Sequence, residues 1–324
     1  MSKEPRIAII GAGLAGLTCA TALKGFADVV VFERSLFVGG RINRFQFGDF
    51  RFNRGEQHFT VTNPLFLSVV DAWKSNGIVR AWDGWLVELD RGKIANMDND
   101  IQRYSGYPSM QTLADNLAHH CNVRLSTTVA EMEKQDSSWQ LFDSKGSYLG
   151  VFDLVILATA APDTAMLATR SRIIRRPASR IDMSVCWSVA LQFEQSLELP
   201  FDAASVLNSP LSSLARFQYP EEEAPVSEER WLLYGSPEWS VQNASSFRDR
   251  VESVLTDAFF EALDIEAIEP ISSSIYCWKH AQPINTIDQD CLFDTELALG
   301  ACGDWCTAPR IEGAVLSGFS MADR

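Results

Sequence analysis

The sequence lacks any Cys-x-x-Cys pair, and its seven cysteines are an odd number, so they do not suggest a disulfide framework. Three of them, Cys19, Cys186 and Cys302, lie within apolar stretches, where a free thiol behaves as a small hydrophobic side chain. Free thiols favour a reducing compartment. We therefore expect no disulfides and a cytoplasmic protein.

The sequence also lacks three further features: histidines at metal-ligand spacing, long apolar runs and an excess of basic residues. The four histidines show no His-Glu-x-x-His or similar spacing, so we predict no metal site. Apolar runs such as residues 155–161 are far shorter than the roughly 18 residues of a membrane span. The apolar run at residues 7–10 begins too early to follow a cleaved signal peptide. The net charge of −14 argues against nucleic acid and anionic membranes as partners.

Residues 7–17 carry the strongest motif, which consists of an apolar strand, a glycine-rich turn and the start of a helix. Gly11 permits the tight turn, Gly13 lets the backbone approach a pyrophosphate, and Gly16 allows the helix to pack closely on the strand. Glu33 follows 17 residues after Gly16, at the end of a second apolar run, where it can accept a ribose hydroxyl. The helix N-terminus adds free amides and the positive end of a dipole. The motif predicts that a dinucleotide binds here.

The length of 324 residues, with 46% hydrophobic and 22% charged residues, suits two ordinary globular domains. Strand–helix–strand patterning indicates an α/β fold with a Rossmann-like domain built from discontinuous segments. Alternating apolar residues and turn signals indicate an inserted α+β domain with a mainly antiparallel sheet. We assign residues 1–75, 105–170 and 284–324 to the nucleotide-binding domain, and residues 76–104 and 171–283 to the inserted domain.

Apolar periodicity and capping residues predict the individual elements. We expect helices over residues 14–24, 64–75, 110–119 (with Ser109 as N-cap), 245–263 and 313–322. We expect strands over residues 6–10, 29–33, 184–193, 214–217, 231–235, 275–280 and 297–302. Residues 123–129, 139–143 and 148–158 should form a small meander, and the acidic, proline-flanked residues 220–225 an exposed loop.

Three further segments should meet the dinucleotide motif at one ligand. The glycines before Arg41 let the chain pass close to a cofactor, and Arg41 can pair with its phosphates. The second segment is residues 55–59. In the third, a Gly-Asp pair that ends a strand places Asp304 where a sugar-alcohol chain can be hydrogen-bonded. The helix expected from Gly313 and Ala314 presents amides to a ring that becomes anionic on reduction.

Together these segments resemble the FAD-binding core of the amine-oxidase-like flavoprotein superfamily and, within it, the bacterial-type renalase family. The pairing of Cys-Gly-Asp-Trp-Cys at residues 302–306 with Glu-Gly-Ala-x-x-Ser-Gly at residues 312–318 is specific, and the likeness covers nearly the whole chain. The resemblance implies non-covalent FAD and oxidation of dihydronicotinamide isomers of NAD(P)H to NAD(P)⁺, with dioxygen reduced to hydrogen peroxide. It also implies a set of FAD-binding residues: Gly11, Gly13, Ala15, Gly16, Glu33, Arg34, Gly40, Arg41, Gln57, His58, Val129, Asp304, Gly313 and Ala314.

Residues 53–58 depart from that family's pattern. Asn53-Arg54-Gly55-Glu56 stands where Asp-Leu-Gly-Ala or Asp-Met-Gly-Ala is usual, so two charges lie next to the segment expected near the flavin. His58 stands where a tyrosine is expected.

Hydride transfer from a dihydropyridine to a flavin needs little acid–base chemistry, because the protein mainly has to stack two rings and stabilise charge. Four aromatic residues in or next to the inserted domain are candidates for the stacking wall: Tyr104, Tyr107, Trp187 and Trp278. Trp187 lies on the regular apolar face of its strand and is expected in the core. The segment from Trp278 to His280 resembles the one that approaches the flavin in the family. The resemblance therefore implies catalytic roles for Trp278, His280 and Tyr104.

Two other functions remain open at this point. An oxidase of amines or polyamines would share the fold and the cofactor, so the fold cannot decide between the substrates. A flavin-carrying binding or sensor protein without turnover is the second alternative, and the charges of Arg54 and Glu56 are the sequence feature that suggests it.

Overall fold

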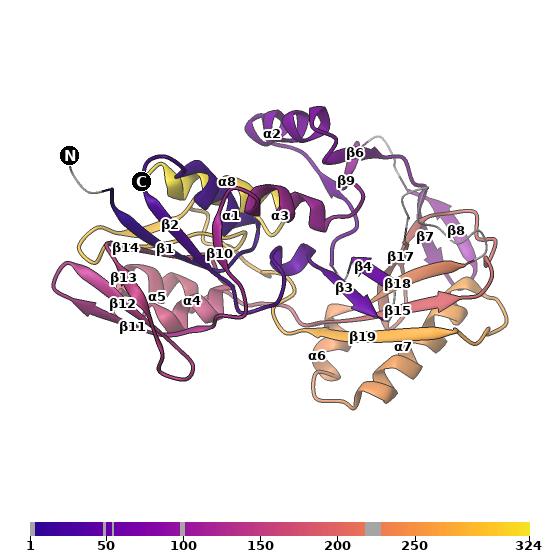
Figure 1. Ribbon diagram of the computed structural model, residues 1–324. Helices are drawn as coiled ribbons and strands as arrows, with labels where there is room; N and C mark the ends of the chain where they lie inside the picture. The colour runs from indigo at the N-terminus through magenta and orange to yellow at the C-terminus, as the bar shows by residue number, and fades with distance from the viewer. Residues whose placement is uncertain (1–3, 48–49, 54, 98–100, 218–227) are drawn as a thin grey trace.

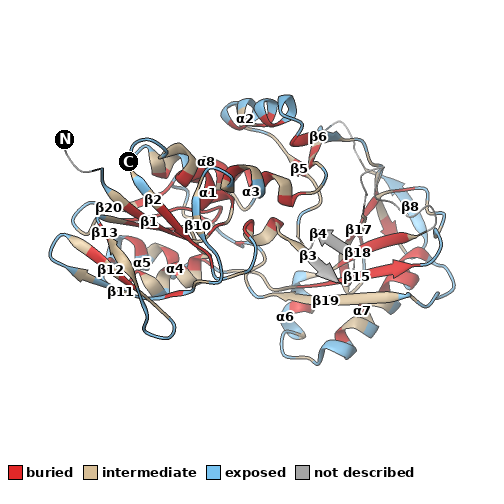
Figure 2. Ribbon diagram, viewed as in Figure 1, coloured by how far each residue is buried: buried red, intermediate tan, exposed pale blue. Residues whose placement is uncertain are grey.

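The computed structural model describes residues 4–47, 50–53, 55–97, 101–217 and 228–324. Two layered units lie side by side, one around a six-stranded sheet and the other around a seven-stranded sheet (Figure 1). Buried residues are concentrated in the central strands of both sheets (Figure 2). Arg54 and the predicted loop at residues 220–225 lie outside the described residues.

The six-stranded sheet forms the Rossmann-like unit that the glycine motif predicts. All neighbouring strands pair in parallel except the last two, which are antiparallel. The strands, in spatial order, are β10 (Asn122–Arg124), β2 (Asp28–Phe32), β1 (Arg6–Ile10), β14 (Leu154–Leu157), β21 (Leu299–Ala301) and β20 (Leu292–Asp294).

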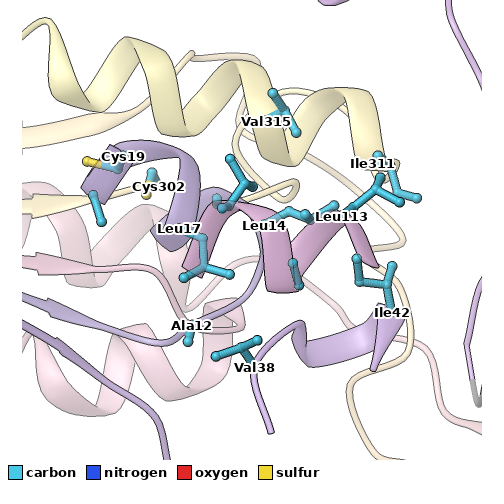
Figure 3. Packing of buried hydrophobic residues seen from close by; sticks show 14 of the residues in the cluster. Ala12, Leu14, Leu17, Cys19, Val38, Ile42, Leu113, Cys302, Ile311 and Val315 are labelled. Carbon is cyan, nitrogen blue, oxygen red and sulfur yellow. The ribbon is translucent and has the colours of Figure 1, made fainter. Parts of the chain in front are cut away.

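Both faces of this sheet are covered, which explains why its strands are continuous apolar runs. Ile7 and Ile9 pack toward one group of helices, and Ala8 and Ile10 pack toward the other. Figure 3 shows side chains of the first group interlocking with residues of the glycine turn. The first group is α1 (Leu14–Ala22), α3 (Gln111–Ala118) and α8 (Ile311–Ala322), and the second is α4 (Ala161–Leu167) and α5 (Arg172–Ala178).

A three-stranded antiparallel sheet packs beside α4 and α5, where Trp139, Leu141 and Phe152 join the same core. The prediction for its first strand was wrong, because residues 123 and 124 belong to β10 and pair with β2 instead. The reason is physical: a strand of three residues carries no alternation of its own, and its long-range partner decides its place. The sheet contains β11 (Val129–Gln135), β12 (Ser138–Asp143) and β13 (Tyr148–Phe152).

The seven-stranded sheet is mainly antiparallel, as predicted, with one parallel pair between β16 and β7. The apolar side chains Val251, Leu255 and Phe259 of α7 cover one of its faces. The strands, in order, are β19 (Ser272–Trp278), β15 (Cys186–Phe193), β18 (Glu229–Gly235), β17 (Leu211–Arg216), β16 (Ala203–Val206), β7 (Leu86–Asp90) and β8 (Lys93–Asn96). The helices of this unit are α6 (Pro237–Gln242) and α7 (Arg248–Leu263).

Smaller elements lie between the two large sheets. This region contains a hairpin, a three-stranded sheet whose central strand pairs with the other two, a 3-10 turn and one helix. Across the described ranges, no helix is both long and apolar enough to cross a bilayer. The elements are η1 (Gly40–Ile42), β3 (Arg44–Phe47), β4 (Phe50–Asn53), β5 (Phe59–Thr60), α2 (Pro64–Ser75), β6 (Val79–Trp82) and β9 (Arg103–Gly106).

Several boundaries differ from the predicted ones. The N-cap of α3 is Met110, not Ser109, because the helical backbone begins one residue later than the sequence signal. The strand predicted over residues 275–280 ends at Trp278, which leaves His280 in a turn. Ile174 of α5 packs in the core of the first unit, so we propose to move the domain boundary from residue 170 to about residue 182.

Two crossing segments connect the units and run antiparallel to each other. The amide of Ser184 donates to the Gln282 carbonyl at 2.8 Å, and the amide of Ala281 donates to the Ser184 carbonyl at 2.9 Å. The amide of Ile284 then donates to the Asp182 carbonyl at 2.8 Å. These two crossings, at residues 182–184 and 281–284, therefore form one short hydrogen-bonded ribbon.

All seven cysteines are free thiols. Cys19 and Cys302 lie in the core beside α1 and α8 (Figure 3), and burial raises the pKa of Cys19 to about 12. Burial also raises the pKa values of Cys302 and Cys306 on either side of Asp304.

Glu312, in the first turn of α8, holds the start of α2. Its carboxylate accepts hydrogen bonds from the amides of Thr62 and Asn63 at 2.7 and 2.8 Å and from the Thr62 hydroxyl. Asn63 is the N-cap of α2, and its side chain accepts from the Leu65 amide at 2.8 Å. Burial opposes the charge of Glu312, but these hydrogen bonds outweigh it and lower the pKa.

We expect Glu312→Gln to lower the free energy of unfolding by about 1–3 kcal/mol near neutral pH, because an amide replaces one of two accepting oxygens with a donor. The pKa of Glu312 is lower in the folded chain than its ordinary value of 4.5. This stabilisation is therefore complete above that pH and is lost as the pH falls through the folded-state pKa. Melting curves of the wild type and the variant should converge in acid. The exposed Glu131→Gln is the control, and an equal gap at every pH would contradict the assignment.

Candidate functional site

The glycine turn between β1 and α1 has the backbone geometry that the motif predicts. Gly11 has a φ of +107°, and a Cβ there would lie 2.5 Å from the Ala158 carbonyl oxygen. A Cβ on Gly16 would lie 2.1 Å from the Gly11 carbonyl oxygen, so the helix packs tightly on the turn. A Cβ on Gly13, by contrast, would meet no described atom within 4 Å. The turn therefore leaves open space only at the residue assigned to the pyrophosphate.

Glu33 lies buried at the end of β2, at the same edge as the glycine turn. One carboxylate oxygen accepts from the Ala12 amide and the other from the Ser35 amide, both at 2.9 Å. The Glu33 carbonyl accepts from the Thr127 amide at 2.8 Å, which brings the start of β11 at Val129 beside it. The guanidinium of the next residue, Arg34, is exposed and pairs with Asp163 at 3.3 Å. Such a surface pair contributes little stability.

Arg41 and Asp304, predicted separately to bind phosphate and sugar, form a two-point ion pair with each other. Their N–O distances are 2.6 and 2.7 Å, and Arg41 also donates to the Ala281 carbonyl at 3.2 Å. Burial disfavours the charge of Arg41, but the carboxylate of Asp304 outweighs this and raises the pKa of Arg41. The pair joins the loop after β2, the loop after β21 and the ribbon between the units.

The start of α8 lies next to Asp304. The helix begins at Ile311, two residues before the predicted Gly313, and its N-cap Arg310 makes no side-chain capping bond. A Cβ on Gly313 would lie 2.0 Å from the Ala308 carbonyl oxygen, so only glycine fits. Ala314 follows in the same turn, and its amide already donates to the Arg310 carbonyl. The amides before it stand at the positive end of the helix dipole.

One face of the seven-stranded sheet carries aromatic and polar residues. Ser188 lies directly opposite both Tyr234 and Tyr276, and Cys186 lies opposite Trp278. Residues directly opposite each other in a sheet share a face, so these five side chains form one surface, which we call the aromatic face. The ring centroids of Tyr276 and Trp278 are 4.7 Å apart at 73°.

Trp187 lies on the opposite face of the same strand and is buried, as predicted. It packs in the core formed with α7, and its indole nitrogen donates to the Asn243 carbonyl at 3.1 Å. Its neighbour across the sheet on that face is Cys277.

Residues 55–57 connect the aromatic face to the nucleotide-binding unit. A Cβ on Gly55 would lie 1.7 Å from the Arg41 carbonyl oxygen, so this segment lies directly on the Arg41 backbone. The Tyr234 hydroxyl donates to the Gly55 carbonyl, and the Gln57 amide donates to the same carbonyl at 2.8 Å and to the Tyr234 hydroxyl at 3.3 Å. Tyr234 therefore binds the two units together at the segment expected near the flavin.

Glu56 and His58 are the unusual side chains of this segment. The His58 ring lies 4.6 Å from the Trp82 ring, and burial together with the charge of Arg103 lowers the pKa of His58 to about 4. His58 is therefore neutral at physiological pH. Glu56 is exposed, yet desolvation by the surrounding protein raises its pKa, with Arg41 opposing the shift.

The three residues predicted as catalytic lie in two different places. Trp278 is half-buried on the aromatic face, and His280 follows in the turn that leads to Ala281, with its buried Nδ1 unpartnered by any described residue. Tyr104 instead lies in the core beneath α2, 5.9 Å from the Phe59 ring, with the Lys74 ammonium 5.6 Å from its ring centre. The geometry therefore does not support a contact of Tyr104 with Trp278 or His280.

The sequence reasoning missed Tyr234 and Tyr276. A signal was available, because Trp231 and Leu233 fill the core face of β18 and alternation then puts Tyr234 on the other face. In the part of the chain that the structure describes, no group of three or more His, Cys, Asp or Glu side chains is arranged to hold a metal ion.

Comparison with known proteins supports this architecture. Residues 9–73 match the family model described as an NAD(P)-binding Rossmann-like domain. A protein from Exiguobacterium sp. 255-15, provisionally named a protoporphyrinogen oxidase, superposes with a TM-score of 0.79 at 10% identity, covering 99% of this chain and 98% of that one. Cyclohexylamine oxidase from Brevibacterium oxydans IH-35A superposes with a TM-score of 0.75 at 13% identity, covering 99% of this chain and 98% of that one. A triple mutant of putrescine oxidase gives 0.76 at 13% identity, covering 98% of each chain.

Likeness at these identities shows the fold. It confirms the predicted α/β architecture with a Rossmann-like dinucleotide-binding domain, and it is the fold expected of the amine-oxidase-like superfamily. The closer resemblance to the renalase family stays a prediction.

Proposed function

We propose that this chain is an FAD-dependent oxidase of dihydronicotinamide isomers of NAD(P)H. The observation that carries the proposal is the convergence of the dinucleotide turn and the aromatic face at Arg41. The side chain of Arg41 contacts Asp304 and Ala281, and its backbone supports Gly55, which Tyr234 binds. A dinucleotide that starts at the glycine turn would therefore extend toward the aromatic face.

The residues present fit non-covalent FAD. Gly13 leaves room for the pyrophosphate, and the buried carboxylate of Glu33 lies at the end of β2, where a ribose is bound in Rossmann-like folds. We assign Arg41 and Asp304 to the pyrophosphate and the sugar-alcohol chain. The orphaned Nδ1 of His280 has the capacity for one further hydrogen bond. The other predicted contacts are Gly11, Ala15, Gly16, Arg34, Gly40, Gln57, His58, Val129, Gly313 and Ala314.

FAD, when bound, supplies a hydride acceptor that dioxygen can reoxidise with release of hydrogen peroxide. The residues of this chain then have to orient a planar substrate ring and stabilise charge. Tyr276 and Trp278 offer aromatic surface for the ring, and the N-terminal turn of α8 favours negative charge nearby. No proton has to be removed from a dihydropyridine, so the scheme needs no catalytic base. The free thiols fit a cytoplasmic enzyme.

The visible spectrum of the purified protein tests the first part of the proposal, because a flavin absorbs visible light. Rapid anaerobic mixing with 2- and 6-dihydronicotinamide dinucleotides should then bleach the flavin, and admission of air should restore the colour with one hydrogen peroxide per turnover. Reduction by dithionite alone would instead favour a flavin-binding or sensor protein without turnover.

Oxidation of amines is the second candidate, and Glu56 is the observation that favours it. An accessible carboxylate near an aromatic face suits a cationic amine. Cyclohexylamine oxidase and putrescine oxidase share the fold, although that alone does not transfer their substrates. Bleaching by an amine but not by either nicotinamide isomer would replace the first candidate with this one.

We expect Gly13→Ala to lower FAD affinity roughly tenfold or more while the chain stays folded, since the new methyl group occupies the space assigned to the pyrophosphate. The φ of Gly13 is −76°, which alanine adopts freely, so the cost to folding should be about 1 kcal/mol or less. Gly16→Ala is the matched variant, and its clash with the turn should lower the melting temperature. FAD titration and melting curves measure both effects. Wild-type affinity in Gly13→Ala would remove the turn from the cofactor site.

We expect Trp278→Ala to slow flavin reduction by the substrate much more than it weakens FAD binding. Loss of the indole removes stacking worth about 0.5–1.5 kcal/mol and the alignment of the substrate ring. Trp187→Ala, on the opposite face of the sheet, should instead cost about 3–5 kcal/mol of stability. Stopped-flow reduction rates and melting temperatures separate the two. A destabilised Trp278→Ala with a normal reduction rate would make Trp278 a packing residue.

A further inference from the structure

Glu56 is held in a fixed position between the two units. Its neighbours on both sides, Gly55 and Gln57, are hydrogen-bonded to the Tyr234 hydroxyl. The Gly55 backbone also lies against the Arg41 carbonyl, too closely for any side chain. The Gln57 carbonyl accepts from the Ser105 hydroxyl at 2.9 Å. The backbone that carries Glu56 therefore cannot shift without breaking contacts with both units.

The electrostatic surroundings of Glu56 come from three elements. Its charge interacts with Arg41 of η1, Cys186 of β15 and Tyr234 of β18. The last two belong to the aromatic face. Because Gly55 and Gln57 are hydrogen-bonded to the Tyr234 hydroxyl and Gly55 lies on the Arg41 carbonyl, Glu56 lies where that face meets the Arg41 loop. Cys186 and Tyr234 are neutral, because burial raises the pKa of the Cys186 thiol to about 12 and that of Tyr234 well above 10.

Arg41 does not need Glu56 as a counter-ion. Both terminal nitrogens of Arg41 already bind the two oxygens of Asp304, at 2.6 and 2.7 Å. Among the described residues, Glu56 makes no ion pair within 4 Å. A counter-ion for Arg41 is thus already present, and the Glu56 carboxylate remains accessible at the aromatic face.

We propose that Glu56 is a catalytic carboxylate that faces the substrate ring and stabilises the positive charge that the ring acquires on oxidation. The inference rests on the proposed function and deepens it. In the reaction, a C–H bond of the dihydropyridine breaks and the hydrogen leaves with both bonding electrons to the flavin. The ring nitrogen then shares its lone pair, and the product is an aromatic pyridinium with one positive charge. Dioxygen finally takes up the two electrons with two protons as hydrogen peroxide.

An anion beside that ring favours the reaction, because the attraction between unit charges strengthens when the bound ring displaces the water between them. The attraction grows as the charge develops, so it lowers the barrier rather than only tightening binding of the neutral substrate. Glu56→Gln keeps the size of the side chain and removes the charge.

The test uses two ligands that share the pyridine ring and the carboxamide, the 1-methylnicotinamide cation and neutral nicotinamide. They differ in charge and by one N-methyl group. Each is titrated into the oxidised, FAD-loaded protein while the flavin absorbance is followed. We expect Glu56→Gln to weaken binding of the cation roughly tenfold and to leave binding of nicotinamide unchanged. The exposed Glu131→Gln, on β11 of the other unit, should change neither. Equal binding of the two ligands by the wild type, or an unchanged cation affinity in Glu56→Gln, would overturn the proposal.

Stopped-flow reduction separates this proposal from the proposed function. If dihydronicotinamides reduce the wild-type flavin, Glu56→Gln should lower the limiting reduction rate roughly tenfold at an unchanged FAD content. If they do not reduce the wild type at all, the proposed substrate is wrong whatever the titrations show. A normal reduction rate in Glu56→Gln would refute a role for Glu56 even with the proposed substrate intact.

Discussion

The ion pair between Arg41 and Asp304 is the interaction on which the rest of the site depends. It joins positions 263 residues apart in the sequence and, through the Ala281 carbonyl, reaches the ribbon that connects the two units. Breaking such a pair costs more than the pair contributes, since the remaining charge is left without its partner. The glycines at positions 55 and 313 let neighbouring backbone approach closely around it. Three loops therefore meet at this one ion pair.

The parts of the fold that follow from local rules could be predicted from the sequence. The β1–α1–β2 unit could be predicted because glycine spacing and apolar runs each specify it. The helix α2 could be predicted because its apolar residues recur at helical spacing. The parts that depend on distant partners could not. β10 has three residues and is defined only by its pairing with β2, and β20 similarly needs β21. Short elements have too few residues for a periodic signal.

The candidate site shows the same division. Backbone roles at Gly11 and Gly16 could be predicted because a tight turn and a close approach exclude other residues. The mutual pairing of Arg41 and Asp304 could not, since each was assigned to a ligand and nothing in the sequence gives their distance. The position of Tyr104 could not be predicted for a related reason. An aromatic residue on a short strand can lie on either face of the sheet, and packing against α2 decides which face it occupies.

The burial of the thiols has a chemical consequence for an enzyme that releases hydrogen peroxide. Peroxide oxidises the thiolate, not the protonated thiol. Cys186 lies on the aromatic face, and Cys302 and Cys306 lie two residues before and after Asp304 in the sequence, so all three neighbour residues that the proposal assigns to the flavin site. Their raised pKa values keep them protonated at physiological pH. Under the proposed function, the chain would therefore carry sulfur near its reaction centre in the form that tolerates hydrogen peroxide.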